Sequence, residues 1–158
     1  MNKIRKVNVL CAIVGLFVII FDQAIKFSVL AFVPNGTHIA VCQHVNLILT
    51  YNYGTSFGLL SPSNAMQYYL IVALMFFCIA FVVYVYTKLH RTTEKLFCSL
   101  LIGGAIGNLI DRFVHGAVID FVDVYYNTWH WPAFNFADAC ISCSVGLLIL
   151  YNLVATKS

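Results

Sequence analysis

Apolar residues in this chain fall into four long runs that are separated by shorter polar segments. The runs cover about residues 8–27, 66–87, 96–114 and 136–154, and a helix needs about 20 apolar residues to cross the hydrocarbon layer of a membrane. Each run therefore predicts one membrane-spanning helix. We expect an all-α membrane protein with four transmembrane helices, in which residues 1–158 form a single polytopic domain.

The connection after the first run shows a different pattern. Apolar and polar residues alternate from position 44 to position 51, and a period of two predicts a strand. The following Tyr51-Asn52-Tyr53-Gly54 has the composition of a turn, because Asn and Gly tolerate a positive φ. We expect a small β-containing region between the first and second helices, outside the membrane.

The start of the chain resembles a signal peptide, with three basic residues among the first six and a short apolar core. However, Asp22, Gln23 and Lys26 follow this core, no small-residue cleavage site is present, and more apolar sequence comes next. We therefore expect an uncleaved first spanning helix. Asp22 and Lys26 lie four positions apart, so they share a helical face and can form an ion pair. The spacing fits a structural anchor as well as a functional pair.

Composition supports a membrane location and argues against some partners. Hydrophobic residues make up 61% of the chain and charged residues 9%, and the mean hydropathy of +0.88 is too high for a soluble globular protein. The net charge of +3 comes from basic residues at the ends of apolar runs and not from one basic patch. We therefore expect no nucleic-acid partner.

Lysine and arginine residues mark three segments that alternate to the same side of the membrane. They precede the first run, separate the second from the third, and follow the fourth. The other two connections, about residues 28–65 and 115–135, contain no Lys or Arg, and the positive-inside rule places such segments outside. Both termini and the middle loop should face the cytoplasm, and the β-containing region should be extracytoplasmic.

Acidic residues gather at the outer membrane face in this topology. An ionisable side chain at the bilayer centre costs about 2.5–3.5 kcal/mol, and such residues are kept where they face a bundle interior, a wet cavity or each other. We therefore expect a polar site at the outer face. Five of the six acidic residues belong to it: Asp22, Asp111, Asp120, Asp123 and Asp138.

The third run carries small and polar residues at helical spacing. Gly103 and Gly107 form a small-xxx-small step, which lets a neighbouring helix approach closely. Asn108 and Arg112 lie four positions apart and share a face, and Asp111 is next to Arg112. Arg112 is placed to neutralise a carboxylate such as Asp111 or to contact a substrate directly, and the sequence leaves both roles open.

Asp120 and Asp138 differ from the other acidic residues, because no Lys or Arg lies near either in sequence. If the two side chains converge, repulsion and partial desolvation raise the pKa of one, and the pair shares a proton. In aspartic proteases one carboxylate activates water and its protonated partner polarises the amide carbonyl. Asn135, three residues before Asp138, is placed to orient a carboxylate or to hold a substrate carbonyl. This chemistry needs no cofactor, and no metal-binding spacing such as HExxH occurs.

Five motifs, which run in order from the first apolar run to the fourth, resemble those of bacterial lipoprotein signal peptidase, also called signal peptidase II. The likeness covers essentially the whole chain, and one departure is Ser56, where the family often has alanine. The motifs are Asp22-Gln23-x-x-Lys26, Asn52-x-Gly54-x-x-Phe57, Gly103-Gly104-x-x-Gly107-Asn108-x-x-Asp111-Arg112, Val118-x-Asp120-Phe121 and Phe134-Asn135-x-Ala137-Asp138.

The resemblance implies a membrane aspartyl endopeptidase of the bacterial inner membrane, which acts as a monomer at the outer face. Its partners would be membrane lipids and diacylglyceryl-modified prolipoproteins, from which it would remove the signal peptide before the lipidated cysteine. Asp120 and Asp138 would be catalytic. The resemblance and the outer-face position imply supporting or binding roles for Asp22, Lys26, Asn52, Gly54, Asn108, Asp111, Arg112 and Asn135. The alternative is a small proton-coupled transporter using the same carboxylates, although transporters place their sites near the membrane midplane.

Overall fold

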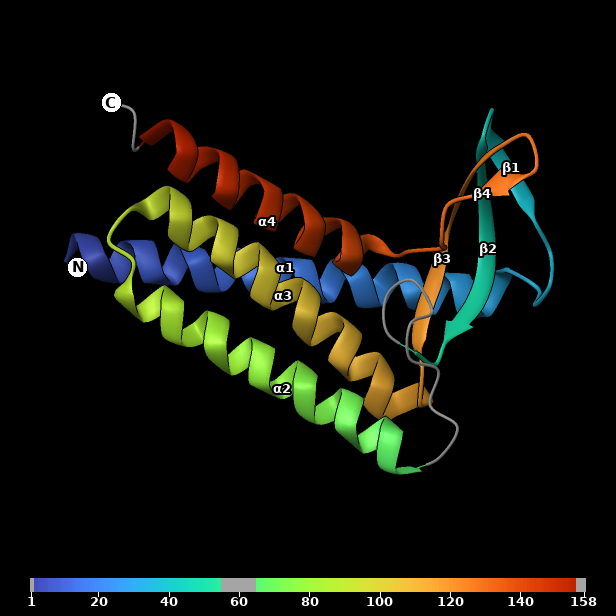
Figure 1. Cartoon of the computed structure of the whole chain (residues 1–158), viewed down its shortest axis with the longest axis horizontal. Helices are drawn as coiled ribbons and strands as arrows, with labels where there is room; N and C mark the ends of the chain where they lie inside the picture. The colour runs from blue at the N-terminus through green and yellow to red at the C-terminus, as the bar shows by residue number, and fades with distance from the viewer. Residues whose placement is uncertain (1, 55–64, 156–158) are drawn as a thin grey trace.

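The computed structural model describes residues 2–54 and 65–155 (Figure 1). Phe57, the last residue of the second sequence motif, and Ser56 lie outside the described residues. The described chain contains four helices and four strands. In chain order they are α1 (Lys3–Phe32), β1 (Ile39–Cys42), β2 (Val45–Asn52), α2 (Ala65–Lys88), α3 (Thr92–His115), β3 (Val118–Tyr126), β4 (Trp129–His130) and α4 (Phe136–Ala155).

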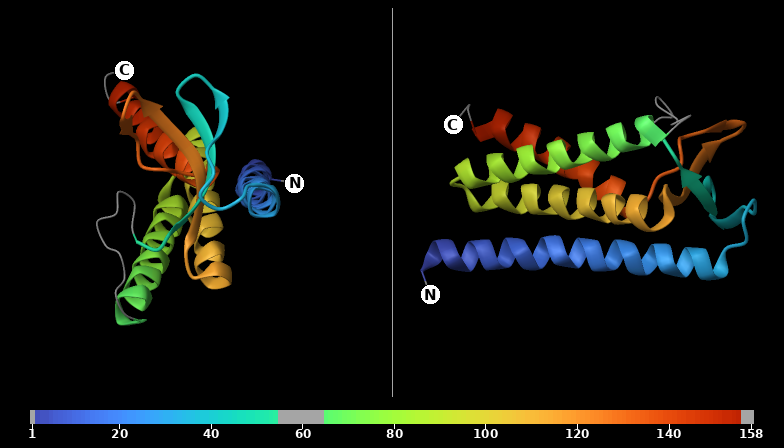
Figure 2. Two further views of the ribbon diagram at one scale, coloured as in Figure 1. Left: turned by 90° about the vertical axis from the view of Figure 1, so that its right-hand side faces the viewer. Right: turned by 90° about the horizontal axis from the view of Figure 1, so that it is seen from below.

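The four helices include the ranges expected from the apolar runs and extend beyond them. Each is long and apolar enough to cross a membrane, which confirms the prediction of four such helices. α3 lies at the centre, in contact with α1, α2 and α4 (Figure 2). Half of the residues in its apolar window are buried, against 11% in each of the other helices. The other three helices therefore turn most of their surface outward, where lipid would cover it.

Glycines on α3 let the two flanking helices approach its backbone, as their small-residue spacing predicts. A Cβ atom on Gly103 would lie 2.7 Å from the carbonyl oxygen of Gly15 on α1. A Cβ atom on Gly104 would lie 2.7 Å from the carbonyl oxygen of Ala137 on α4. Real Cβ atoms do not come that close to backbone, so only glycine allows this packing.

The strands form one antiparallel sheet in the order β1-β2-β3-β4. It lies at the end of the helix bundle opposite the start of α1 and the end of α4 (Figure 1). A cluster of buried residues joins the sheet to the C-terminal end of α1: Val29, Val33, Leu49, Ile119 and Phe121. This cluster fixes the sheet across the end of the bundle.

The sheet contains the predicted strand and is larger than the β-containing region that we expected. β2 matches the strand expected from alternating residues, but it continues through Asn52, where we expected a turn, because Asn52 pairs with Val118. The β-region is also not limited to the connection between the first two helices, since β3 and β4 come from the connection between α3 and α4. Most of β3 is buried on both faces, so its sequence lacks the alternation that reveals a half-exposed strand.

Candidate active site

A buried lysine organises the polar residues on α1 and α3. Lys26, which is 2% exposed, has its Nζ 2.7 Å from Oδ2 of Asp22 and 2.7 Å from Oδ2 of Asp111. The same Nζ donates a hydrogen bond of 2.9 Å to Oδ1 of Asn108. The expected pairing of Asp22 with Lys26 is therefore present. Removing one partner from a buried pair of this kind costs about 3–5 kcal/mol, because an uncompensated charge remains inside.

The two carboxylates around Lys26 also receive hydrogen bonds from neighbouring elements. Oδ1 of Asp22 accepts from the backbone N–H of Ala137 at the start of α4, at 2.9 Å. Asp111 accepts from the N–H of Ile119 on β3 at 3.1 Å and from Nε2 of Gln23 at 2.8 Å. Gln23, which belongs to the first motif, has no role in the sequence prediction. These bonds place α4 relative to α1, and β3 relative to the central helix α3.

Asn135 and Asp138 form a reciprocal cap at the start of α4. Oδ1 of Asn135 accepts from the backbone N–H of Asp138 at 2.8 Å, and Oδ2 of Asp138 accepts from the N–H of Asn135 at 3.2 Å. A polar residue and an acidic residue three positions later commonly exchange bonds in this way at a helix start. The remaining Oδ1 of Asp138 accepts from Nδ2 of Asn108 at 2.8 Å. The carboxyl group is therefore held at both oxygens.

Asp120 is held by two side-chain amides. Oδ1 accepts from Nδ2 of Asn135 at 2.7 Å, and Oδ2 accepts from Nδ2 of Asn52 at 3.0 Å. Burial raises the pKa of Asp120 to about 7, and the nearby Asp138 adds to this effect. The hydrogen bonds from Asn52 and Asn135 and the charge of Lys26 act in the opposite direction. Lys26 is the cation near the carboxyl groups of both Asp120 and Asp138. It lies far from both in sequence, so the sequence did not predict this proximity.

A cavity of about 790 Å³ opens beside these residues, between α2, α3, α4 and the segment that precedes α4. Asp120 and Asp138 both line it, and Ile71, Leu74 and Leu101 belong to its apolar wall. Of the ten site residues predicted from the sequence, six line this cavity: Asn52, Gly54, Asn108, Arg112, Asp120 and Asp138. The other four, which are buried and bonded to the lining residues or to their neighbours, are Asp22, Lys26, Asp111 and Asn135.

Arg112 binds backbone carbonyl groups at the end of β2. Its guanidinium donates to the oxygen of Tyr53 at 2.6 Å and to the oxygen of Gly54. Its own carbonyl oxygen accepts from the hydroxyl group of Tyr68 on α2 at 2.6 Å, a contact that the sequence did not predict. Within the described ranges Arg112 takes part in no ion pair. Asp111, which the sequence offered as its partner, pairs with Lys26. Arg112 therefore ties β2 and α2 to the central helix.

Asp123, the fifth acidic residue of the group that we expected at the outer face, does not lie in this cavity. Its carboxylate, 3% exposed, accepts from Nδ2 of Asn46 at 2.9 Å and lies 2.7 Å from Nδ1 of His130 and 3.5 Å from Nδ1 of His38. Burial raises the pKa of Asp123, but the bonds from His130 and Asn46 outweigh burial, so its pKa lies below the ordinary value. Asp123 holds the tip of the sheet together and does not line the cavity.

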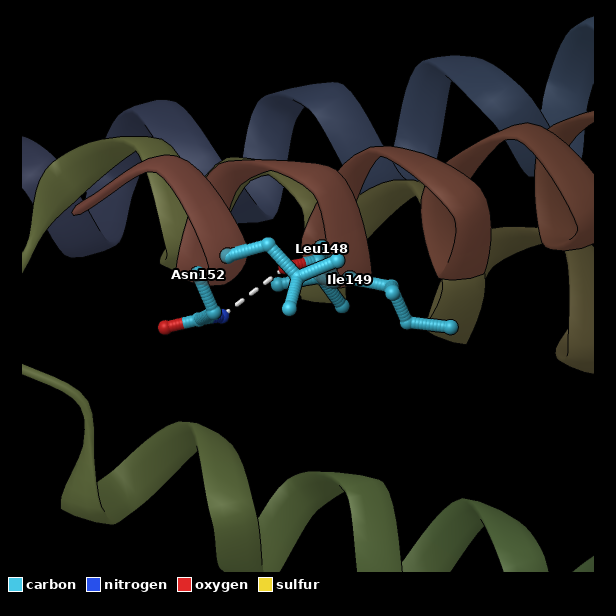
Figure 3. A pocket seen from close by; sticks show the side chains of 4 residues that line it. Leu148, Ile149 and Asn152 are labelled. Carbon is cyan, nitrogen blue, oxygen red and sulfur yellow. Dashed lines mark hydrogen bonds between the residues drawn. The ribbon is translucent and has the colours of Figure 1, made fainter. Parts of the chain in front are cut away.

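A second, shallower cavity of about 410 Å³ lies near the other end of α4 (Figure 3). Leu148, Ile149, Asn152 and Leu153 line it, and Nδ2 of Asn152 donates to the carbonyl oxygen of Leu148 at 2.9 Å. It contains no ionisable side chain. Across residues 2–54 and 65–155, no group of three or more His, Cys, Asp or Glu side chains is arranged to hold a metal ion. Of these two cavities, the first is the one lined by ionisable side chains.

Four helices that are long and apolar enough to cross a membrane, three of which line a cavity with two carboxyl groups, are typical of an integral membrane protein whose site can support acid–base chemistry. Residues 14–154 match the family described as signal peptidase (SPase) II. The chain belongs to this family of membrane peptidases.

Individual relatives agree with this assignment. The lipoprotein signal peptidase of Paraburkholderia phymatum is 40% identical over 143 residues, which cover 89% of this chain and 85% of the relative. That of Paraburkholderia phytofirmans is 41% identical over 143 residues, or 89% and 82% of the two chains. Two solved structures of a bacterial membrane enzyme give TM-scores of 0.79 and 0.78, at 29% and 30% identity. The two matches cover 91% and 94% of this chain, and 92% and 90% of the respective solved chains.

Proposed function

We propose that this protein removes the signal peptide from diacylglyceryl-modified prolipoproteins and cuts just before the lipidated cysteine, with Asp120 and Asp138 as the catalytic pair. The observation that carries the proposal is that both carboxyl groups line one cavity and are linked through Asn135. Membership of the signal peptidase II family and relatives named lipoprotein signal peptidases support the substrate class. These relatives give no support to a proton-coupled transporter.

The surroundings of the two carboxyl groups assign them different roles. Asp138 lies in the first turn of α4, where the helix dipole and the N–H of Asn135 favour a negative charge. It is half-buried, so water can reach it. Asp120 lies on a strand, is 1% exposed and has a pKa raised by burial to about 7, so it is about half protonated at neutral pH and mostly protonated at lower pH. We therefore assign Asp138 as the base and Asp120 as the acid.

Peptide hydrolysis follows from these assignments. Asp138 takes a proton from water, whose oxygen attacks the scissile carbonyl carbon, while Asp120 donates its proton to the carbonyl oxygen. The tetrahedral intermediate then collapses, Asp138 returns its proton to the leaving nitrogen, and Asp120 regains the proton of the hydroxyl group. The products are the carboxyl end of the signal peptide and the free amino group of the lipidated cysteine. Both carboxyl groups return to their starting states.

The position of the cavity suits a substrate that remains in the membrane. Its polar lining includes Asn52 and Asp120 of the sheet, and its apolar wall includes residues of α2 and α3. With both termini in the cytoplasm, as the basic residues predict, the cavity faces the outer side, where exported proteins emerge. Because one chain supplies both carboxyl groups and their partners, we propose that it acts as a monomer in the bacterial inner membrane.

Substitution of each carboxyl group tests the proposal. Asp120→Asn and Asp138→Asn should each abolish cleavage of a lipidated prolipoprotein by the purified protein, with little change in thermal stability. Because residues that act as a unit are not additive, the double variant should be no worse than either single variant. Near-normal turnover by either single variant would overturn the assignment.

A further inference from the structure

The segment between β4 and α4 forms one wall of the cavity and pairs only partly with β3. Phe134 exchanges two hydrogen bonds with Val122, its N–H donating at 3.1 Å and its oxygen accepting at 2.9 Å. Further along, the N–H of Trp131 donates to the oxygen of Val124 at 2.8 Å. Residues 131–134 thus run alongside β3 as an extended segment, and all four of them line the cavity.

The pairing slips by one residue within this segment. Tyr125 is opposite His130, but Val122 is opposite Phe134, so three steps along β3 correspond to four steps along the segment. An extra residue on one strand is a β-bulge, and bulges are frequent beside active sites, where they end pairing or redirect a residue. The bulge frees part of the backbone of the segment from β3.

Within the described residues, this arrangement leaves the backbone of Ala133 without a partner. Neighbouring residues on a strand point their N–H and C=O groups to opposite edges, so Ala133 points away from β3 when Phe134 points toward it. Ala133 makes no hydrogen bond to any other residue in the described part of the chain. Pro132, next to it, has no N–H to offer. A backbone donor and acceptor therefore remain open at Ala133, beside the cavity that holds Asp120 and Asp138.

We propose that the substrate binds as an added strand along residues 131–134, with one substrate residue exchanging both main-chain hydrogen bonds with Ala133. The inference rests on the proposed function and specifies how that site presents the scissile bond. Strand addition uses main-chain bonds, so it does not depend on substrate side chains. It also supplies partners for the N–H and C=O groups that a helical signal peptide loses when it unwinds for cleavage.

The other strand edges of the sheet do not offer the same opportunity. β1 forms one edge of the sheet, but none of its residues lines the cavity. The open side of β3 at Ile119 is occupied, because its N–H donates to Asp111 and its oxygen accepts from Asn135. Among the described residues, the edge at Ala133 therefore combines free backbone groups with direct access to the catalytic pair.

An ester scan of the substrate tests the proposal without altering the protein. We would use a synthetic lipidated prolipoprotein peptide in detergent micelles and replace one backbone N–H at a time by oxygen, leaving the scissile bond intact. The residue opposite Ala133 should lose about five- to tenfold in kcat/KM, as expected for one hydrogen bond, while the esters on either side of it have little effect. A flat scan, or an equal loss at every position, overturns strand addition.

A pair of variants tests the protein side. Ala133→Pro removes the donor and should raise KM several-fold with little change in kcat. The rise should be larger than in Ala133→Gly, which keeps both backbone groups. Wild-type KM in Ala133→Pro contradicts the proposal, and if that variant does not fold, the ester scan decides alone. Cleavage of the all-amide peptide distinguishes failure of the proposed peptidase function from failure of strand addition. If that peptide is cut while the scan is flat, the peptidase function stands and strand addition fails.

Discussion

Replacing Asn52 by alanine should change the pH dependence of cleavage. Nδ2 of Asn52 donates to Oδ2 of Asp120 at 3.0 Å, and this bond stabilises the ionised carboxylate more than the protonated acid. The pKa of Asp120, about 7, should therefore rise when the amide is removed. Because the proposed mechanism needs the proton on Asp120, activity falls as pH rises through this pKa. The variant should keep its activity to a higher pH than the parent.

The size of the shift follows from the strength of the lost bond. A hydrogen bond to a charged group contributes about 1.5–3 kcal/mol, and each unit of pKa corresponds to about 1.4 kcal/mol. The full effect would be about one to two pH units. Asn52 is half-buried and lines the cavity, so water replaces part of the lost bond. We expect a shift of about one unit, which moves the alkaline limb from about pH 7 to about pH 8.

The assay is kcat/KM for a lipidated prolipoprotein peptide, measured between about pH 5 and about pH 9, where the profile reports groups of the free enzyme. Asn46→Ala is the matched control. It lies on the same strand and removes a similar bond of 2.9 Å, but to Asp123, which is outside the cavity. An alkaline limb that stays in place or moves to lower pH in Asn52→Ala would refute the reasoning, as would an equal shift in Asn46→Ala.

Three further predictions address packing, Arg112 and orientation. Gly104→Ala should cost about 1–3 kcal/mol of stability and reduce activity, because its Cβ would press on the backbone of Ala137, next to Asp138, the proposed base. Gly146→Ala, whose Cβ would meet no described atom within 4 Å, should be harmless in a thermal unfolding assay. Arg112→Lys should lower kcat/KM about tenfold, because the planar guanidinium binds the two carbonyl oxygens through two separate nitrogens, a geometry that a single ammonium group does not reproduce. Unchanged activity would refute this role. An impermeant thiol reagent should label single cysteines in the β3–β4 connection from outside but not those between α2 and α3, and the reverse pattern would invert the proposed topology.

The sequence predicts those parts of the fold in which a residue pattern corresponds to a single environment of the chain, such as lipid. The four apolar runs predict the helices because each must cover its own length in lipid. β2 is predictable because Val45, Leu47, Leu49 and Tyr51 alternate with other residues along a strand that stays mostly half-buried. β3 is not, since Val118, Ile119, Asp120 and Phe121 are all buried and show no alternation. A short run rich in β-branched and aromatic residues was the signal available there.

The candidate site shows the same limit. Local spacing indicates the pairing of Asp22 with Lys26 and the position of Asn135 before Asp138, because these partners lie on one helix or at its start. The approach of Lys26 to Asn108 depends on how α1 packs against α3, more than 80 residues away in sequence. The sequence motifs indicate that these residues belong together, but they do not indicate which atom binds which.

The hydrogen bonds that cap the start of α4 also position the carboxyl groups of Asp120 and Asp138. Asn135 caps the helix through its Oδ1, restrains Asp138 through its backbone N–H and binds Asp120 through its Nδ2. If the first turn of α4 frays, both carboxyl groups lose a partner together, while the rest of the bundle can remain folded. We therefore expect local melting of this single turn to inactivate the protein, and a ligand that bridges the two carboxyl groups to stabilise the turn.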